Sequence, residues 1–419
     1  MRAADAIVDS LKQRKNRASR DARSHQAANN RLVFQVVMKE WGHNNVMARV
    51  RKFSGLAVLV LLTPAMAQTN TPFDPADFKI PLWHSEVQLR GALGYKDNVT
   101  LSSTDPQGSA FWMSGIEAIA FRLPSGGWQF NALFDATDVR YFDSPSVDNE
   151  QQVVAVAEVT RDLGRDWKSA LGFNYLFQNQ VFDMSATYTN AAAIGQIVGH
   201  TLSPRWKLRK ELRPFWVETE LNATRQILEA PLDGFWQFGP RLAAGRKLGR
   251  RSEISLAYQW SWLGYDSREQ ADAAGLAITN TSLALQTHLV ELAWTQTWDE
   301  KKRWQTTTRA GFEANNDNGS GFYDYYNYRL TQELRFREKN WEARARARLS
   351  YYDYLTQPVG ADDPSKRHRT LVAVTLLAER KLAKHLKVFA SYTWEKSSSN
   401  LSFDNYQASI MTGGCAVTF

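Results

Sequence analysis

Hydrophobic and polar residues alternate one by one along much of this chain, and the alternation is clearest between residues 341 and 354. One parity there reads Trp341, Ala343, Ala345, Ala347, Leu349 and Tyr351, and the other reads Glu342, Arg344, Arg346, Arg348, Ser350 and Tyr352. Successive side chains of a β-strand point to opposite faces, so a strand would have one apolar and one charged face. A helix would scatter the arginines around its circumference. The pattern therefore predicts a strand.

The apolar face of this strand has the length of a lipid-facing band. An aromatic residue stands at each end, at Trp341 and Tyr351, with small or aliphatic residues between them. A transmembrane strand needs about 9–11 residues and carries aromatic residues at both membrane interfaces. If lipid covers this face, water must lie on the other, and the arginines line a lumen. The segment predicts a transmembrane β-barrel.

The same alternation recurs through residues 81–419 and predicts an all-β chain, an antiparallel transmembrane β-barrel of about 16 strands. Short turns alternate with longer loops, and one of the short turns is expected at Lys210 and Glu211. Even strand numbers, short periplasmic turns and longer outside loops are typical of outer-membrane barrels. A tryptophan follows several of the short turns, which predicts an aromatic girdle at one interface: Trp128, Trp167, Trp304 and Trp341.

The segment before the barrel is predicted to be an export signal. Arg49, Arg51 and Lys52 precede a short apolar run, and Ala65-Met66-Ala67 completes the pattern of a secretory signal peptide over residues 47–67. Residues 68–80 are expected to form a periplasmic lead-in. Residues 1–46 are interpreted as an upstream misreading of the start, with an unusually long n-region as the alternative.

The excess of positive over negative charge lies entirely in this N-terminal part. The formal net charge is +8, but residues 1–67 hold 12 Lys and Arg against 4 Asp and Glu, and the remainder holds 39 of each. A basic isoelectric point therefore does not indicate nucleic-acid binding by the folded body, and no nucleic-acid partner is expected.

The last residues resemble the assembly signal of Gram-negative outer-membrane β-barrel proteins of the porin-like kind. Phe419 is terminal, and Val417, Cys415, Gly413 and Met411 share its parity. The resemblance implies recognition by the barrel-assembly machinery and contact with outer-membrane lipid and lipopolysaccharide. Gly413 and Cys415 depart from the pattern, because bulkier residues are more usual there.

A second, shorter resemblance lies at residues 94–99, Gly-Tyr-Lys-Asp-Asn-Val. This segment is similar to the first hairpin of barrels involved in polysaccharide export and surface-lipoprotein delivery. Those families usually carry helical-repeat domains before the barrel, which this sequence does not show.

No motif in the sequence predicts enzymatic chemistry. His84, Ser85 and Glu86 are the types found in catalytic triads, but adjacent strand residues face opposite sides and cannot converge. No His, Cys, Asp and Glu set has metal-ligand spacing. A single cysteine, Cys415, cannot form an internal disulfide. We expect no enzyme activity, no cofactor and no metal. A barrel hydrolase acting on lipid or lipopolysaccharide is kept as an alternative of another class.

The candidate functional residues are charges predicted to face the lumen. One wall is expected to hold Arg329, Glu333, Arg335, Arg344, Arg346 and Arg348, and Glu218 and Glu220 are expected five or six strands away. The arginine patch would attract anionic solutes, and opposed acid and base would create a transverse field that favours small polar solutes over apolar ones. Alternatively, Arg and Glu pair across strands and fill the interior.

Six tyrosines, at 325, 326, 328, 351, 352 and 354, are interpreted as an outer aromatic girdle, with a sugar-stacking platform as the alternative.

These patterns favour a channel for passive diffusion of small polar or anionic solutes. The second hypothesis is an export channel for a surface polysaccharide or another cell-surface polymer. The sequence leaves open whether the barrel assembles as a homo-trimer.

Overall fold

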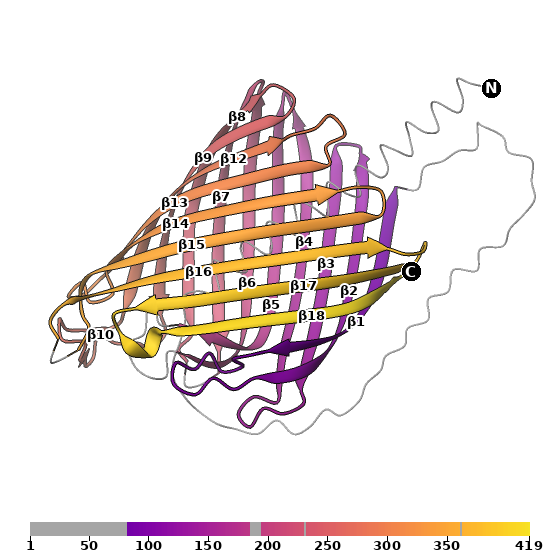
Figure 1. Cartoon of the computed structure of the whole chain (residues 1–419). Coiled ribbons are helices and arrows are strands. Elements are labelled where there is room, and N and C mark those ends of the chain that lie inside the picture. The colour runs from indigo at the N-terminus through magenta and orange to yellow at the C-terminus, as the bar shows by residue number, and fades with distance from the viewer. Residues whose placement is uncertain (1–81, 185–193, 230–231, 361–362) are drawn as a thin grey trace, which may run out of the picture.

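The structure, a computed structural model, describes residues 82–184, 194–229, 232–360 and 363–419 (Figure 1). The extension, signal peptide and lead-in predicted for residues 1–80 lie outside these ranges. Within them, no helix is long and apolar enough to cross a membrane.

Sixteen antiparallel strands close into one barrel, as the alternation predicted. The first eight are β1 (Trp83–Lys96), β2 (Ser109–Ser125), β3 (Trp128–Tyr141), β4 (Asn149–Gly164), β5 (Trp167–Asp183), β6 (Ile194–Leu212), β7 (Phe215–Leu228) and β8 (Phe235–Leu248). The other eight are β9 (Ser252–Tyr265), β12 (Ala284–Thr297), β13 (Trp304–Asp317), β14 (Tyr325–Arg337), β15 (Trp341–Pro358), β16 (Lys366–Lys381), β17 (Leu386–Ser399) and β18 (Tyr406–Thr418).

The barrel closes where the first strand meets the last. In Figure 1 the indigo β1 lies beside the yellow β18, and Leu93 is opposite Gly413 in the antiparallel register. Closure leaves no unpaired sheet edge, which is the condition for a sheet to span a bilayer.

Short turns and long loops lie at opposite ends of the barrel. The C-terminal residue Phe419 is at the short-turn end, where its amide donates to the carbonyl of Val87 at 2.8 Å. In outer-membrane barrels the short-turn end is periplasmic. The longest described loop, between β9 and β12, carries a small hairpin of β10 (Gln270–Ala271) and β11 (Ala277–Ile278) that the sequence reading did not predict.

The turn predicted at Lys210 and Glu211 is wrong. These residues belong to β6 and pair with Val217 and Trp216 of β7, and the turn falls at Arg213 and Pro214. Three consecutive charged residues, Arg209 to Glu211, looked like a connection, but Arg209 and Glu211 face the lumen, where charge is tolerated.

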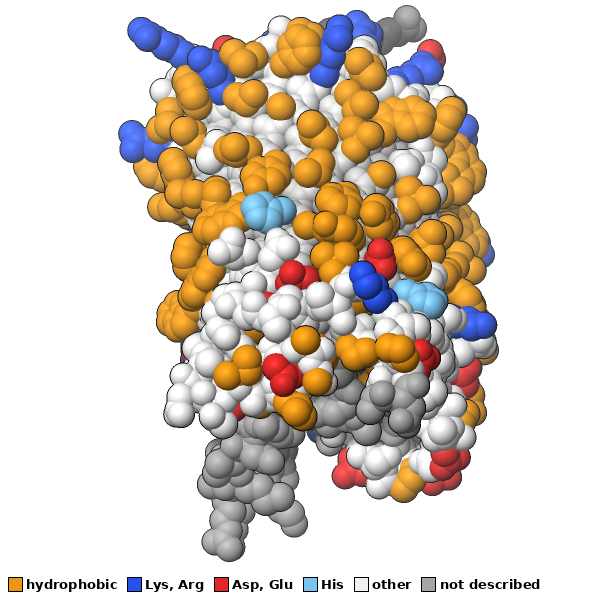
Figure 2. Space-filling view, turned by 90° about the vertical axis from the view of Figure 1, so that its left-hand side faces the viewer, with side chains coloured by type: hydrophobic (Ala, Val, Ile, Leu, Met, Phe, Trp, Pro, Cys, Tyr) orange, Lys and Arg blue, Asp and Glu red, His pale blue; other side chains and the backbone are white. Residues whose placement is uncertain are grey.

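The two faces of the wall differ as the alternation requires. Large apolar side chains are exposed on the outer wall, such as Leu171 at 64% and Leu256 at 54%, and Figure 2 shows hydrophobic side chains spread across it in a broad band. The opposite parity turns inward, where Arg346 is only 9% exposed. An apolar exterior around a polar interior is the arrangement that lipid outside and water inside demand.

Candidate functional site in the barrel lumen

The predicted arginine wall lies on the inner face of β14 and β15. These strands pair antiparallel, with Glu333 opposite Arg346 and Arg335 opposite Arg344. Alternation places one further arginine of β14, Arg337, on the same face. All predicted members share this face: Arg329, Glu333, Arg335, Arg344, Arg346 and Arg348.

Every arginine of this wall contacts a glutamate. Arg346 donates from Nε to Glu333 at 2.9 Å, and Arg335 Nη2 lies 3.1 Å from Glu342. The remaining N–O distances are 2.7 Å for Arg329–Glu313, 3.0 Å for Arg337–Glu342, 3.4 Å for Arg344–Glu342, 3.8 Å for Arg344–Glu333 and 3.8 Å for Arg348–Glu395. Cross-strand pairs of this kind hold long side chains in fixed positions.

The pairing does not neutralise the wall. Six arginines, at 329, 335, 337, 344, 346 and 348, contact only four glutamates, at 313, 333, 342 and 395, which leaves an excess of two positive charges. The arginines therefore stiffen the wall and also charge it.

Arg309 of β13 adds a cation that was not among the lumen residues predicted from the sequence. It is opposite Thr331 of β14, and it makes no ion pair with any described residue. Arg241 and Arg346 are the cations that act on it electrostatically, and Glu291 and Glu333 are the anions. A guanidinium group without a bound carboxylate keeps its donors available for an anion in the lumen. The alternation in β13 places Arg309 on the inward face, but the threonines before it form no cluster of charges that would have singled it out.

The far wall is not acidic. Glu218 lies 3.5 Å from Arg209 and 3.6 Å from Arg241, and Glu220 lies 3.6 Å from Lys207. Five cations and four carboxylates alternate here, the cations being Arg205, Lys207, Arg209, Arg241 and Lys247 and the carboxylates Glu158, Glu211, Glu218 and Glu220. The two walls thus differ in degree, with an excess of two positive charges on the arginine wall and of one on the far wall.

Side chains meet across the lumen near its outer mouth. Asp183, at the end of β5, accepts hydrogen bonds from Arg369 of β16 and from the hydroxyl of Tyr406 of β18, the latter at 2.8 Å. Strands β5 and β16 are seven places apart in the ring of sixteen, so this contact crosses the barrel. Val181 packs in the same cluster as Leu371, which confirms the crossing. The contact narrows the outer mouth.

A second buried ion pair ties a loop to the same end. Arg367 of β16 and Asp404, in the short helix η3 (Ser402–Asp404), both have fully buried side chains. Arg367 also donates to Gln357 at 2.7 Å and lies 4.5 Å from the ring centre of Tyr354. This arrangement fixes the connection between β17 and β18.

The six tyrosines do not form one girdle. Tyr325, Tyr352 and Tyr354 are at most 1% exposed and form a cluster inside the mouth. Tyr328 and Tyr351 are 49% and 38% exposed on the outer wall. The girdle interpretation is therefore wrong for the inward three, because neighbours along a strand point to opposite faces.

Two histidines lie on the opposite face of their strand from a neighbour that a catalytic triad would need. His84 packs on Phe121, with ring centres 5.1 Å apart, while Ser85 is on the other face of β1. His288 bonds to the Tyr258 hydroxyl at 2.8 Å on the outer wall, and Glu291 faces inward. Within the described ranges no group of three His, Cys, Asp or Glu side chains could hold a metal ion.

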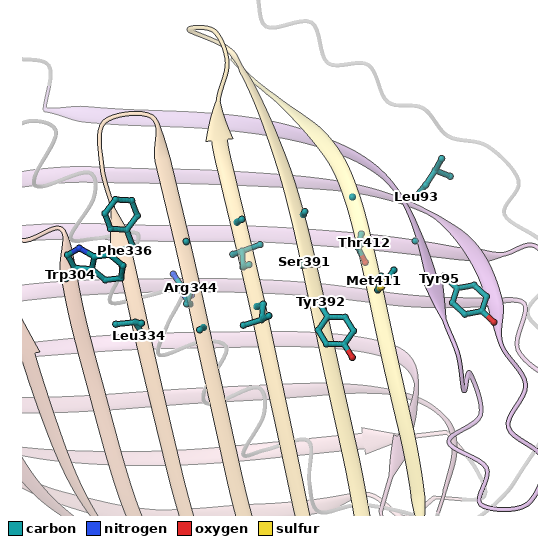
Figure 3. Close-up of a pocket in the computed structure, with 18 residues that line it drawn as sticks. Leu93, Tyr95, Trp304, Leu334, Phe336, Arg344, Ser391, Tyr392, Met411 and Thr412 are labelled. Atoms are coloured by element: carbon teal, nitrogen blue, oxygen red, sulfur yellow. The ribbon is translucent and has the colours of Figure 1, made fainter.

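A hollow of about 1070 Å³ lies on the outer wall, where β13 to β18 meet β1. Its floor is made by small side chains, including Ala345 and Gly413, and Figure 3 shows Tyr392, Met411 and Tyr95 on neighbouring strands at one end. The residues of the predicted assembly signal, Met411, Val417 and Phe419, are 58%, 37% and 69% exposed on this wall. Recognition of these residues by the barrel-assembly machinery stays a prediction.

No family model and no curated protein matches the chain. Among solved structures, it is similar to OccAB3 of Acinetobacter baumannii, with 9% identity over 81% of this chain and 100% of that chain and a TM-score of 0.44. It is also similar to the outer-membrane protein OmpT of Vibrio cholerae in its trimer form, with 12% identity over 80% and 99% of the two chains and a TM-score of 0.43. A bacterial polysaccharide outer-membrane secretin matches with 10% identity over 80% and 97% and a TM-score of 0.40.

Similarity at this level adds no argument about solutes or partners. The identification rests on the ring of sixteen strands, the apolar outer wall and the charged interior. This chain is an integral outer-membrane β-barrel protein with porin-like architecture.

Proposed function

We propose that the barrel is an outer-membrane channel for passive diffusion of small polar solutes, with a preference for anions. The observation that carries the proposal is the excess of two positive charges on the β14 and β15 wall, next to the unpaired Arg309. In a water-filled passage with low-dielectric walls, such charges raise the local concentration of anions.

The far wall supports the same direction of selectivity. Its ladder of Glu218, Glu220 and their cationic neighbours carries one excess positive charge, so nothing there offsets the positive wall. Solutes would pass by size and electrostatics alone, without a chemical step.

The test is single-channel recording in a planar bilayer. We expect the purified barrel to open ion-conducting steps, and a KCl gradient to give a reversal potential displaced toward that of chloride. Absence of conductance, or a cation preference, would contradict the proposal.

Export of a surface polymer is the second candidate, and the narrowed outer mouth favours it. The contact of Asp183 with Arg369 and Tyr406 crosses the passage that a diffusing solute would need. A pore that stays closed until a partner is added supports export, whereas spontaneous conductance supports diffusion.

A further inference from the structure

The outer wall carries a repeated cation and aromatic pair at the periplasmic end. In four hairpins the aromatic residue that begins a strand after a short turn is directly opposite an arginine or lysine of the next strand. The pairs are Trp128 with Arg161, Trp167 with Lys210, Phe215 with Arg246 and Trp341 with Arg380.

In each pair the cation lies over the aromatic ring. The distances from the cation to the ring centre are 4.9 Å for Arg161, 4.8 Å for Lys210, 5.1 Å for Arg246 and 4.9 Å for Arg380. This is the range of a cation–π contact. Stacking covers the apolar stem of the cation and leaves its N–H donors directed to the surroundings.

These four cations have no carboxylate partner in the part of the chain that the structure describes, unlike the paired arginines of the lumen. None of them makes an ion pair with a described residue. By contrast Arg209, the neighbour of Lys210 that faces the lumen, lies 2.9 Å from Glu211 and 3.5 Å from Glu218. A cation held at a membrane interface without an internal counter-ion is neutralised from outside the protein.

The position of the pairs identifies what can neutralise them. Three of the aromatic members are exposed on the lipid-facing wall, with Trp128 at 43%, Phe215 at 48% and Trp341 at 45%, and Trp167 is partly exposed. Figure 2 shows Lys and Arg side chains gathered along one edge of the hydrophobic band. The short-turn end lies at the periplasmic leaflet, which is made of phospholipid, so the groups at this depth are phosphate headgroups.

We propose that this basic aromatic ring, Arg161, Lys210, Arg246 and Arg380 with their stacked partners, is a binding surface for anionic phospholipid headgroups of the periplasmic leaflet. The pairs on β3–β4, β5–β6 and β7–β8 follow one another around the wall, two strands or ~10 Å apart, so each can take one headgroup. The guanidinium groups offer two parallel donors to a phosphate, and the ammonium offers a point charge.

The test compares spin-labelled phosphatidylglycerol with spin-labelled phosphatidylcholine at the surface of the barrel in phosphatidylcholine vesicles. A Lys or Arg near an anionic surface contributes ~1 kcal/mol, which corresponds to about a fivefold preference for the anionic lipid at each cation. We expect the unmodified protein to show this preference and the variant Arg161→Gln, Lys210→Gln, Arg246→Gln to lose it at those three positions.

A matched variant removes the same charge from the other end of the outer wall. Arg140→Gln, Lys366→Gln and Lys396→Gln lie at the loop end of β3, β16 and β17, and we expect them to leave the preference unchanged. An equal loss in this control, or a preference retained by the first variant, would overturn the proposal.

A salt titration of the unmodified protein tests the proposal without relying on the folding of a variant. Raising the salt from about 0.01 to about 1 M shortens the screening length from ~30 to ~3 Å. The preference must then collapse. A preference for phosphatidylglycerol that persists at high salt would show that the headgroup charge is not what the ring binds.

Discussion

Reversal of two charges on the arginine wall should reverse the ion preference of the channel. Arg344→Glu with Arg346→Glu changes the wall by four charges, from an excess of two positive to an excess of two negative, given six arginines and four glutamates there. Both side chains face the lumen and are 12% and 9% exposed, so the new carboxylates would face the passage.

The magnitude follows from Coulomb's law. An ion that passes ~8 Å from a unit charge in water gains or loses ~0.5 kcal/mol, and ~0.1 M salt screens away about half of this energy. Four charges therefore change the energy of chloride by ~1 kcal/mol and that of potassium by ~1 kcal/mol in the opposite sense. The chloride to potassium permeability ratio should fall by roughly thirtyfold.

The assay is the reversal potential in a KCl gradient, measured on protein whose folding is verified by heat-dependent gel mobility. The control is Lys396→Glu, which changes a lipid-facing residue at the outer end of β17. Selectivity unchanged from the unmodified protein, in a correctly folded double variant, would refute the reasoning and show that these arginines only fill the interior.

Three further predictions test single features. Arg309→Gln breaks no ion pair, so we expect normal folding and a roughly twofold lower chloride to potassium ratio in the same recording. Asp404→Asn leaves the fully buried Arg367 without its ion-pair partner and should lower the unfolding free energy by about 3 kcal/mol in denaturant titrations, whereas a loss near zero would show that the pair is not fully desolvated. The amide of Trp304 donates to Asp299 in a periplasmic turn and lowers the pKa of that carboxyl, with a further contribution from Arg303. This stabilisation is present above the unfolded Asp pKa, near 3.9, and is lost as the pH falls through the lower folded pKa. Asp299→Asn should therefore remove that acid dependence from proteolysis of the turn, and a variant with the same acid profile as the unmodified protein would contradict it.

The fold could be predicted because the alternation records which face of each strand meets lipid. Between Trp341 and Tyr351 apolar and polar residues alternate without interruption, and the number of strands follows from counting the segments with the same alternation. The turn between β6 and β7 was misplaced because lumen-facing charges such as Glu211 look like turn residues when only local polarity is considered.

The site was predictable only in part. Arg344 and Arg346 stand on one parity of one strand, and their partner Glu333 stands on the next, so the sequence places them together. The contact of Asp183 with Arg369 joins residues 186 positions apart on nearly opposite walls, and no local pattern encodes it. For the same reason the sequence could not show that Glu218 and Glu220 are neutralised by cations of β6 and β8.

The most direct test of an aqueous, positive lumen is thiol modification at two adjacent residues of β14 in a Cys415→Ser background. Thr331 faces inward opposite Arg309 and Arg348, whereas Leu330 is 46% exposed on the outer wall. We expect Thr331→Cys in membranes to react with a charged, water-soluble thiol reagent, faster with an anionic than with a cationic one, and Leu330→Cys to resist both. Equal reaction at the two positions, no reaction at Thr331→Cys, or faster reaction with the cationic reagent would contradict the account.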